Sequence, residues 1–170
     1  MHDEPVLGSD LHLPLAAGEI DPAVPKRIRR LVTSEPFAVL CTQGGGQPYG
    51  SVVGFAFDEA LTAFAFATPR ATRKYDLLTQ CDRVALVVDN RGSFPDDLMK
   101  VGAVTVTGRA REVDLGPEFD HWAGLLKARH PYFRSFVEAP STALFRVDVV
   151  RYIHVTRFQE VHQWIPPSTG

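Results

Sequence analysis

The sequence predicts a mainly β protein, an antiparallel barrel of six or seven strands with peripheral helices. Short segments of alternating apolar and polar residues recur along the chain, and tight turns separate most of them. Tight turns join antiparallel strands, whereas parallel neighbours need a crossover of about a dozen residues or more. Closing such a sheet into a barrel removes its exposed edges, so a barrel is favoured over an open sheet.

Composition and charge indicate one ordinary globular domain. The chain has 170 residues, of which 45% are hydrophobic and 22% charged. Its net charge of −2 gives no general attraction to nucleic acid or to an anionic membrane, so we expect neither as a partner. Any anion-binding site must therefore be local.

The sequence shows neither a secretion signal nor an apolar run long enough to span a membrane, which predicts a cytoplasmic protein. Only two cysteines occur, Cys41 and Cys81, and they form no Cys-x-x-Cys motif, so neither a disulfide framework nor a zinc site is suggested. The histidines have no metal-ligand spacing. We expect a flexible segment over residues 1–20, one domain over 21–166 and a tail over 167–170.

The first elements are a helix and a hairpin. Asp21 is suited to cap a helix whose first residue is Pro22 and which runs to about Ser34. Strands are then expected over residues 37–42 and 48–57, because three consecutive glycines separate two β-patterned segments.

The middle of the chain continues the pattern. Residues 61–67 read as a third strand, with two phenylalanines on one face and small residues on the other. Residues 72–80 have helical composition, 83–89 form a short buried strand, and 102–113 alternate strictly.

The last third predicts one helix and the closing strands. Apolar residues recur at helical spacing over 117–130, and Pro131 ends that run. Residues 144–158 and 161–165 then supply β-branched, strand-forming segments.

The segment 68–74 carries the most chemical information, because it is a basic turn between a strand and a helix. It holds three cations and two hydroxyls: Arg70, Arg73, Lys74, Thr68 and Thr72. A helix N-terminus carries partial positive charge, so cations there are unfavourable unless an external anion joins them. A phosphate monoester would fit, and a solvated basic turn with no ligand is the alternative.

The strand over residues 49–57 has an unusually small face. Gly50, Val52, Gly54 and Ala56 lie on it. Glycine weakens a strand unless something must approach closely, so a flat aromatic ligand would explain the pattern. A tight barrel corner or a packed helix is the alternative explanation.

Taken in order, these segments resemble the pyridoxamine 5′-phosphate oxidase-like FMN-binding split-barrel superfamily. The resemblance covers about residues 25–165 and rests on five segments: 48–57, 66–68, 72–74, 83–86 and 104–110. It implies that residues 21–166 form an FMN-binding split barrel. It also implies a homodimer with two FMN molecules at the interface, each contacted by both chains.

The resemblance also assigns site residues by position. It places Thr68 and Thr72 on the FMN phosphate or ribityl chain, and Arg73 and Lys74 on the phosphate charge. Ser51, Val52 and Val53 would line the isoalloxazine ring, and Ala67 lies in the matching segment. Arg70 is included on charge and proximity. Trp164 is a candidate flavin neighbour from the other subunit, or else a hydrophobic plug for the barrel end.

The chain departs from strict pyridoxamine phosphate oxidases near its end. Those enzymes carry a Trp followed by an Arg-x-His motif, whereas here Arg151 and His154 are one residue too far apart and lack the Trp. Ala103 also stands where they place a polar residue. Vitamin B6 oxidation is therefore not expected, and residues 128–131 and 158–164 look more like the branch with heme-degrading and flavin-reductase-like members.

Three functions follow from the resemblance. The first is an FMN-dependent oxidoreductase, with no side chain nominated as catalytic and its small-molecule substrate unidentified. The second is a heme-binding or heme-degrading protein in which His130, His154 or His162 ligates iron. The third is a non-catalytic flavin carrier or redox sensor. A deazaflavin could replace FMN, since the anchor needs only a phosphate and a flat ring system.

Overall fold

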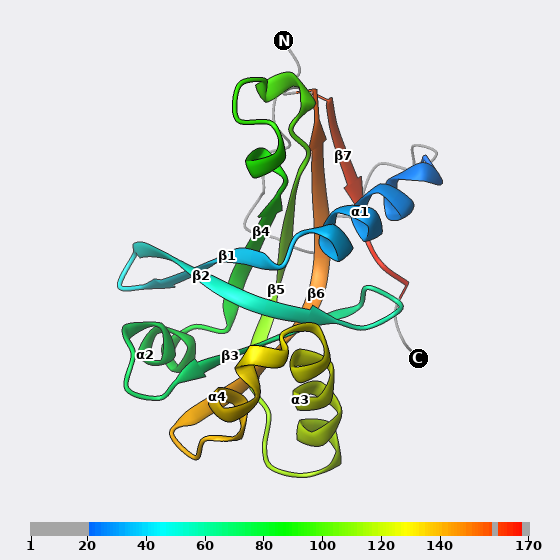
Figure 1. Cartoon of the computed structure of the whole chain (residues 1–170). Helices are drawn as coiled ribbons and strands as arrows, with labels where there is room; N and C mark the ends of the chain where they lie inside the picture. The colour runs from blue at the N-terminus through cyan, green and yellow to red at the C-terminus, as the bar shows by residue number, and fades with distance from the viewer. Residues whose placement is uncertain (1–20, 158–159, 168–170) are drawn as a thin grey trace.

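The computed structural model describes residues 21–157 and 160–167, and it confirms the predicted barrel (Figure 1). The strands lie in the order β3-β2-β1-β4-β5-β6-β7, and β3 also pairs with β6. Six strands thus form a closed antiparallel barrel, with β7 added beside β6. The strands are β1 (Phe37–Gly44), β2 (Gln47–Phe57), β3 (Ala63–Pro69), β4 (Arg83–Asp89), β5 (Ala103–Glu112), β6 (Thr142–Thr156) and β7 (Glu160–Trp164).

Glycine chemistry fixes the β1–β2 hairpin. Gly45 and Gly46 have φ angles of +58° and +80°, and Gly44 pairs with Gln47 across the turn. Two consecutive positive φ angles are typical of a two-residue hairpin turn, and glycine adopts them without strain. The predicted hairpin is therefore confirmed.

Four α-helices flank the barrel: α1 (Ala23–Ser34), α2 (Arg73–Gln80), α3 (Pro117–Arg129) and α4 (Arg134–Glu138). The helix α1 begins one residue later than predicted, although the Asp21 carboxylate still accepts the Ala23 N–H at 2.8 Å. The sequence pattern missed α4, because a single short turn of helix has no periodicity to read. In Figure 1, α3 and α4 lie together against β2 and β3.

The alternation in β3 creates two separate cores. Its inward Phe64 and Phe66 belong to the core inside the barrel. Its outward Ala63, Ala65 and Ala67 belong to a second core beneath α3 and α4. Small outward residues let the helices approach closely. The strand is therefore buried on both faces, except at its last residue, Pro69, which is exposed.

A glycine shapes the junction of β5 and β6. The register shifts between Thr107 and Gly108. A Cβ atom at Gly108 would lie 2.5 Å from the Asp148 carbonyl oxygen, so this bulge requires a glycine.

None of the helices described within residues 21–167 is long and apolar enough to cross a lipid bilayer. The expectations for residues 1–20 and 168–170 lie outside the described residues.

Candidate functional site: a basic turn and a basic pocket

The 68–74 turn joins β3 to α2, as predicted. Thr68 is fully buried, and its hydroxyl lies 3.2 Å from that of Thr72. Thr72 is the N-cap of α2, since its hydroxyl accepts the Tyr75 N–H at 3.3 Å and donates to the Pro69 carbonyl at 2.8 Å. The two threonines therefore fix the shape of the turn, which is a prerequisite for any ligand bound there.

Arg70 has a partner within the protein. Its guanidinium lies 2.6 Å from the Glu112 carboxylate and donates to the Tyr75 hydroxyl at 3.1 Å. The Tyr75 hydroxyl in turn donates to Glu112 at 3.0 Å. The hydrogen bond that Arg70 donates to Glu112 raises the pKa of Arg70, and the carboxylate compensates its charge. A contact between Arg70 and a phosphate remains a prediction.

Lys74 is the cation of this turn that is best placed to bind an anionic ligand. Its side chain is half-buried, and it has no ion pair among the described residues. Loss of solvent lowers the pKa of its ammonium group. An anion bound beside it would stabilise the charged ammonium group and oppose this lowering of its pKa, so the residues here fit a phosphate.

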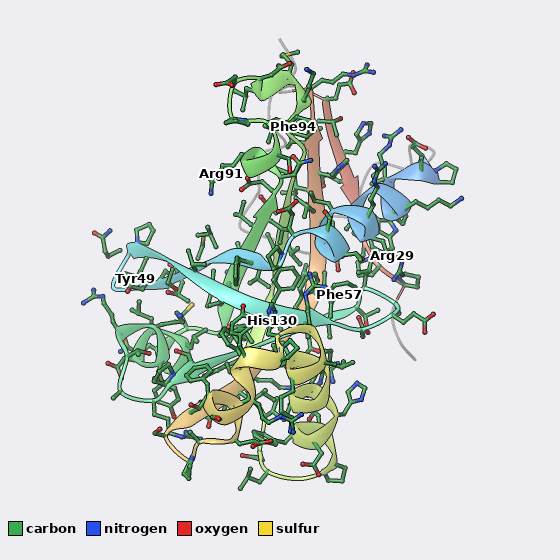
Figure 2. All side chains as sticks on the ribbon, in the orientation of Figure 1. Arg29, Tyr49, Phe57, Arg91, Phe94 and His130 are labelled. Atoms are coloured by element: carbon green, nitrogen blue, oxygen red, sulfur yellow. The ribbon has the colours of Figure 1, made fainter. Side chains whose placement is uncertain are left out.

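Arg73 links this turn to β2. It is exposed, and its guanidinium lies 5.9 Å from the centre of the Tyr49 ring. Figure 2 shows Tyr49 on the arm of the hairpin that lies beside α2. The contact places the basic turn next to the segment that contains Ser51, Val52 and Val53.

Those three residues differ in accessibility. Val52 is 68% exposed on the outer face of β2, whereas Val53 points into the barrel core. The Ser51 hydroxyl is buried without a hydrogen-bond partner among the described residues. Val52 and the backbone beside it are thus the parts of this segment available to a ligand. Ala67 is buried in the outer core, which leaves its backbone as the group able to reach one.

At Gly54, the small face of β2 is explained by packing within the protein and not by a flat ligand. A Cβ atom at Gly54 would lie 2.7 Å from Phe133 and 3.3 Å from the His130 ring. Helix packing, the alternative explanation, therefore accounts for Gly54. At Gly50 a Cβ atom would meet only Val39, at an ordinary 3.6 Å, so this end of the face stays open.

His130 is a packing residue in this structure. Its ring is buried, with Nε2 3.0 Å from the Phe55 carbonyl oxygen and Nδ1 3.4 Å from the Tyr132 hydroxyl. Figure 2 shows it between β2 and the helices α3 and α4. Because both ring nitrogens are engaged, His130 is poorly placed to ligate a metal.

Trp164 packs on the end of the barrel. Its ring centre lies 5.1 Å from that of the buried Tyr152, and it lines a shallow hollow with Pro22 and Pro25 of the α1 region. This contact agrees with the plug alternative, and a role beside the partner's flavin remains a prediction.

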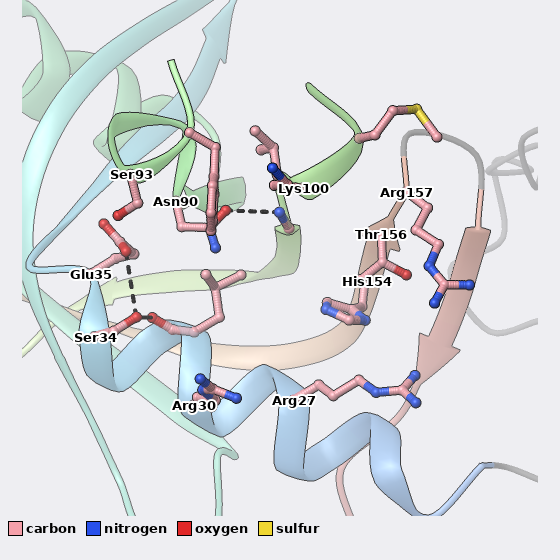
Figure 3. Close-up of a pocket in the computed structure, with 15 residues that line it drawn as sticks. Arg27, Arg30, Ser34, Glu35, Asn90, Ser93, Lys100, His154, Thr156 and Arg157 are labelled. Carbon is pink, nitrogen blue, oxygen red and sulfur yellow. Dashed lines mark hydrogen bonds between the residues drawn. The ribbon is translucent and has the colours of Figure 1, made fainter. Parts of the chain in front are cut away.

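A second site candidate, which the sequence did not reveal, is a pocket of about 650 Å³ between α1, the loop that follows β4, and the end of β6 (Figure 3). We call it the basic pocket. Four cations line it: Arg27, Arg30, Lys100 and Arg157. They come from three separate parts of the chain, so no local cluster of charge in the sequence predicts the pocket.

His154 also lines the basic pocket. It is 3% exposed, and its Nδ1 atom is buried with no hydrogen-bond partner among the described residues. Burial is the largest influence on its pKa, with smaller contributions from His162 and Arg27, and together they lower the value to about 4. The imidazole is therefore neutral at physiological pH.

The turn and the pocket lie at opposite ends of β6. Pro69 pairs with Thr142 at the start of the strand, while His154 lies near its end. At about 3.3 Å per residue, Thr142 and His154 are roughly 40 Å apart along β6. No small cofactor held by the turn can therefore reach the pocket of the same chain.

Comparison with known proteins supports the fold. Residues 24–156 match the family model described as pyridoxamine 5′-phosphate oxidase. Among curated proteins, no sequence matches this chain significantly.

Three solved structures illustrate the structural likeness. A heme-binding protein from Mycobacterium smegmatis superposes with a TM-score of 0.76 at 16% identity, over 86% of this chain but only 59% of that protein. HutZ, described as the heme storage protein from Vibrio cholerae, has a TM-score of 0.66 at 13% identity, over 83% of this chain and 93% of its own. An FAD-binding protein from Mesorhizobium loti has a TM-score of 0.59 at 17% identity, over 76% of this chain and 90% of its own.

At these identities the likeness shows the fold alone. The barrel of six strands, with its added strand and flanking helices, defines a split-barrel protein. The matched residues identify it further: the chain belongs to the pyridoxamine 5′-phosphate oxidase family.

Proposed function

We propose that this protein binds FMN, with the phosphate on the 68–74 turn, and that it is an FMN-dependent oxidoreductase. The observation that carries the proposal is Lys74, a half-buried ammonium with a lowered pKa and no carboxylate partner among the described residues. It lies at the N-terminal end of α2, where free N–H groups and the helix dipole also favour an anion. Family membership supports a flavin as the carrier of that phosphate.

The protein's residues would bind and orient the cofactor. Lys74 and Arg73 would hold the phosphate charge, Thr68 and Thr72 would keep the turn in shape, and Val52 with the backbone around it would contact the ring. FMN would supply the hydride or electron transfer. A deazaflavin carrying a phosphate would use the same anchor.

A homodimer is part of the proposal, and an uncovered sheet face supports it. Val52, Val39 and Val87 form a row of paired positions across β2, β1 and β4, and the next row holds Gly50, Cys41 and Ala85. These small apolar residues face outward, and all are partly or fully exposed in the single chain. An uncovered apolar face of this kind is typical of a protein-protein interface.

The first experiment is the absorption spectrum of protein purified without added cofactor, with the mass of the released ligand. We expect a flavin spectrum and the mass of FMN. A colourless protein that also fails to bind added FMN would overturn the proposal.

The second experiment locates the phosphate. Lys74→Ala should weaken FMN binding roughly 10- to 100-fold, because a charge-assisted hydrogen bond contributes about 1.5–3 kcal/mol. Arg91→Ala is the matched control, since Arg91 is an exposed cation outside the turn. Equal FMN affinities for the two variants, measured by calorimetry, would refute the phosphate assignment.

A heme-binding protein is the second candidate, and His154 favours it. Metal ligation needs a neutral imidazole, and the lowered pKa of His154 keeps it neutral beside a pocket of suitable size. Hemin titration should then give a Soret band that disappears in His154→Gln and persists in His130→Gln. The absence of a Soret shift in the unaltered protein would remove this candidate.

A further inference from the structure

The basic pocket combines charge with apolar surface. In Figure 3, the guanidinium groups of Arg27 and Arg157 lie on one side of His154, and Arg30 lies on the other side, on α1. Leu31, Phe94 and Met99 contribute apolar lining. A concave pocket of this size, mostly apolar with a few convergent polar groups, is the usual form of a small-molecule site.

Lys100 of the pocket pairs with Asp97 at 3.1 Å, but the three arginines are available to a ligand. Arg30 has no ion pair among the described residues. Arg27 and Arg157 pair with Asp21 and Glu160 at 3.5 and 3.2 Å, but both pairs are exposed. Exposed ion pairs contribute only about 0–1 kcal/mol, so a bound anion can replace their carboxylates at little cost.

One carboxylate lies among the lining residues and sets the orientation of a ligand. Glu35 stands at the end of α1, near Ser34, whose hydroxyl is 3.4 Å from its carboxylate. Figure 3 shows Glu35 on the opposite side of the pocket from Arg27 and Arg157. An anionic group would avoid Glu35 and face the arginines.

The unpartnered nitrogen of His154 is an independent sign of a missing ligand. A buried polar atom without a hydrogen bond costs about 1–3 kcal/mol, so native proteins nearly always provide a partner. For Nδ1 of His154, no partner exists among the described residues. A group entering the pocket could supply one.

We propose that the basic pocket binds a small organic anion, a carboxylate or phosphate attached to an apolar body. The anionic group lies against Arg27, Arg30 and Arg157 beside His154, and the apolar body lies against Leu31, Phe94 and Met99. This site is distinct from the 68–74 turn of the same chain, and it does not depend on flavin binding.

The test uses 2-naphthoate as the probe and its uncharged amide, 2-naphthamide, as the matched control ligand. Calorimetry on the full chain should show that the carboxylate binds at least about tenfold more tightly than the amide, because only the carboxylate forms charge-assisted hydrogen bonds. Equal binding of the two ligands, or no binding of either at about millimolar concentration, would overturn the proposal.

Two arginine variants locate the bound anion. Arg30→Gln should weaken 2-naphthoate roughly five- to tenfold, whereas Arg91→Gln, an exposed arginine outside the pocket lining, should leave it unchanged. Both side chains are exposed, so neither variant threatens folding. The same affinity in both variants would contradict the site.

The Lys74→Ala variant separates this inference from the proposed function. It should bind 2-naphthoate as the unaltered protein does, even where it has lost FMN. Loss of 2-naphthoate binding in Lys74→Ala would place the anion on the turn and overturn the assignment to the pocket.

Discussion

The two ends of β6 carry two basic sites that are built differently. At the end where β6 begins, the cations are neighbours in sequence, because the single turn between β3 and α2 holds Arg70, Arg73 and Lys74. At the other end, cations from α1, the loop after β4 and the end of β6 converge on one pocket. A site built from a continuous segment can be read from sequence, and one assembled by tertiary packing cannot.

The largest test of this comparison changes a residue of β5 that packs against β6, the strand that joins the two ends. Gly108→Ala puts a methyl group 2.5 Å from the Asp148 carbonyl oxygen at the β5–β6 bulge. We expect the free energy of unfolding to fall by about 2–3 kcal/mol, since backbone atoms cannot move aside cheaply. Urea denaturation measures it.

Gly92→Ala is the control for that variant, because a Cβ atom there meets nothing within 4 Å. If the two alanine variants were equally stable, the bulge would not constrain β6 as described.

A second test measures how pH changes the stability of the protein through His154, which lies at the pocket end of β6. The folded pKa of His154 is about 4, below the unfolded value of about 6.5. The unfolded chain therefore binds a proton first as pH falls, and stability present above pH 6.5 is lost between about 6.5 and 4. The loss at pH 5 should be about 2 kcal/mol relative to pH 7.

His154→Gln removes the titrating group, so its unfolding free energy should vary less between pH 7 and pH 5 than that of the unaltered protein. His121→Gln, at an exposed position, serves as the control. An unchanged pH dependence in His154→Gln would show that other groups cause the loss.

The smallest expected effect concerns the turn end. Tyr75→Phe removes one hydroxyl that bridges Arg70 and Glu112, and we expect a loss of about 1 kcal/mol in unfolding free energy. Binding of 2-naphthoate at the pocket should stay the same. A simultaneous change in both would mean that the two ends are coupled through β6.

The sequence predicted the barrel because its strands carry clear alternation. Phe64 and Phe66 alternate with alanines, and the paired glycines at 45 and 46 mark the hairpin. It missed α4, which is too short to show a helical period. The order and type of the helices and strands could thus be predicted wherever the segment was long enough to show a periodic pattern.

Site residues were predictable only in part, for physical reasons. The basic turn that contains Thr72 and Lys74 was predicted from local sequence, whereas the capping role of Thr72 and the burial of Lys74 needed the structure. The pairing of Arg70 with Glu112 also needed it, since Glu112 lies on β5 and nothing near Arg70 in sequence indicates it. Gly54 likewise needed the structure, because a glycine that accommodates Phe133 has the same sequence pattern as one that accommodates a ligand.

The separation of roughly 40 Å along β6 has a genetic consequence in the proposed homodimer. Each chain carries both a turn and a pocket, so a dimer that joins a Lys74→Ala chain to an Arg30→Gln chain keeps one intact copy of each site. Two alleles that each damage a different site would therefore still supply both binding sites when expressed together.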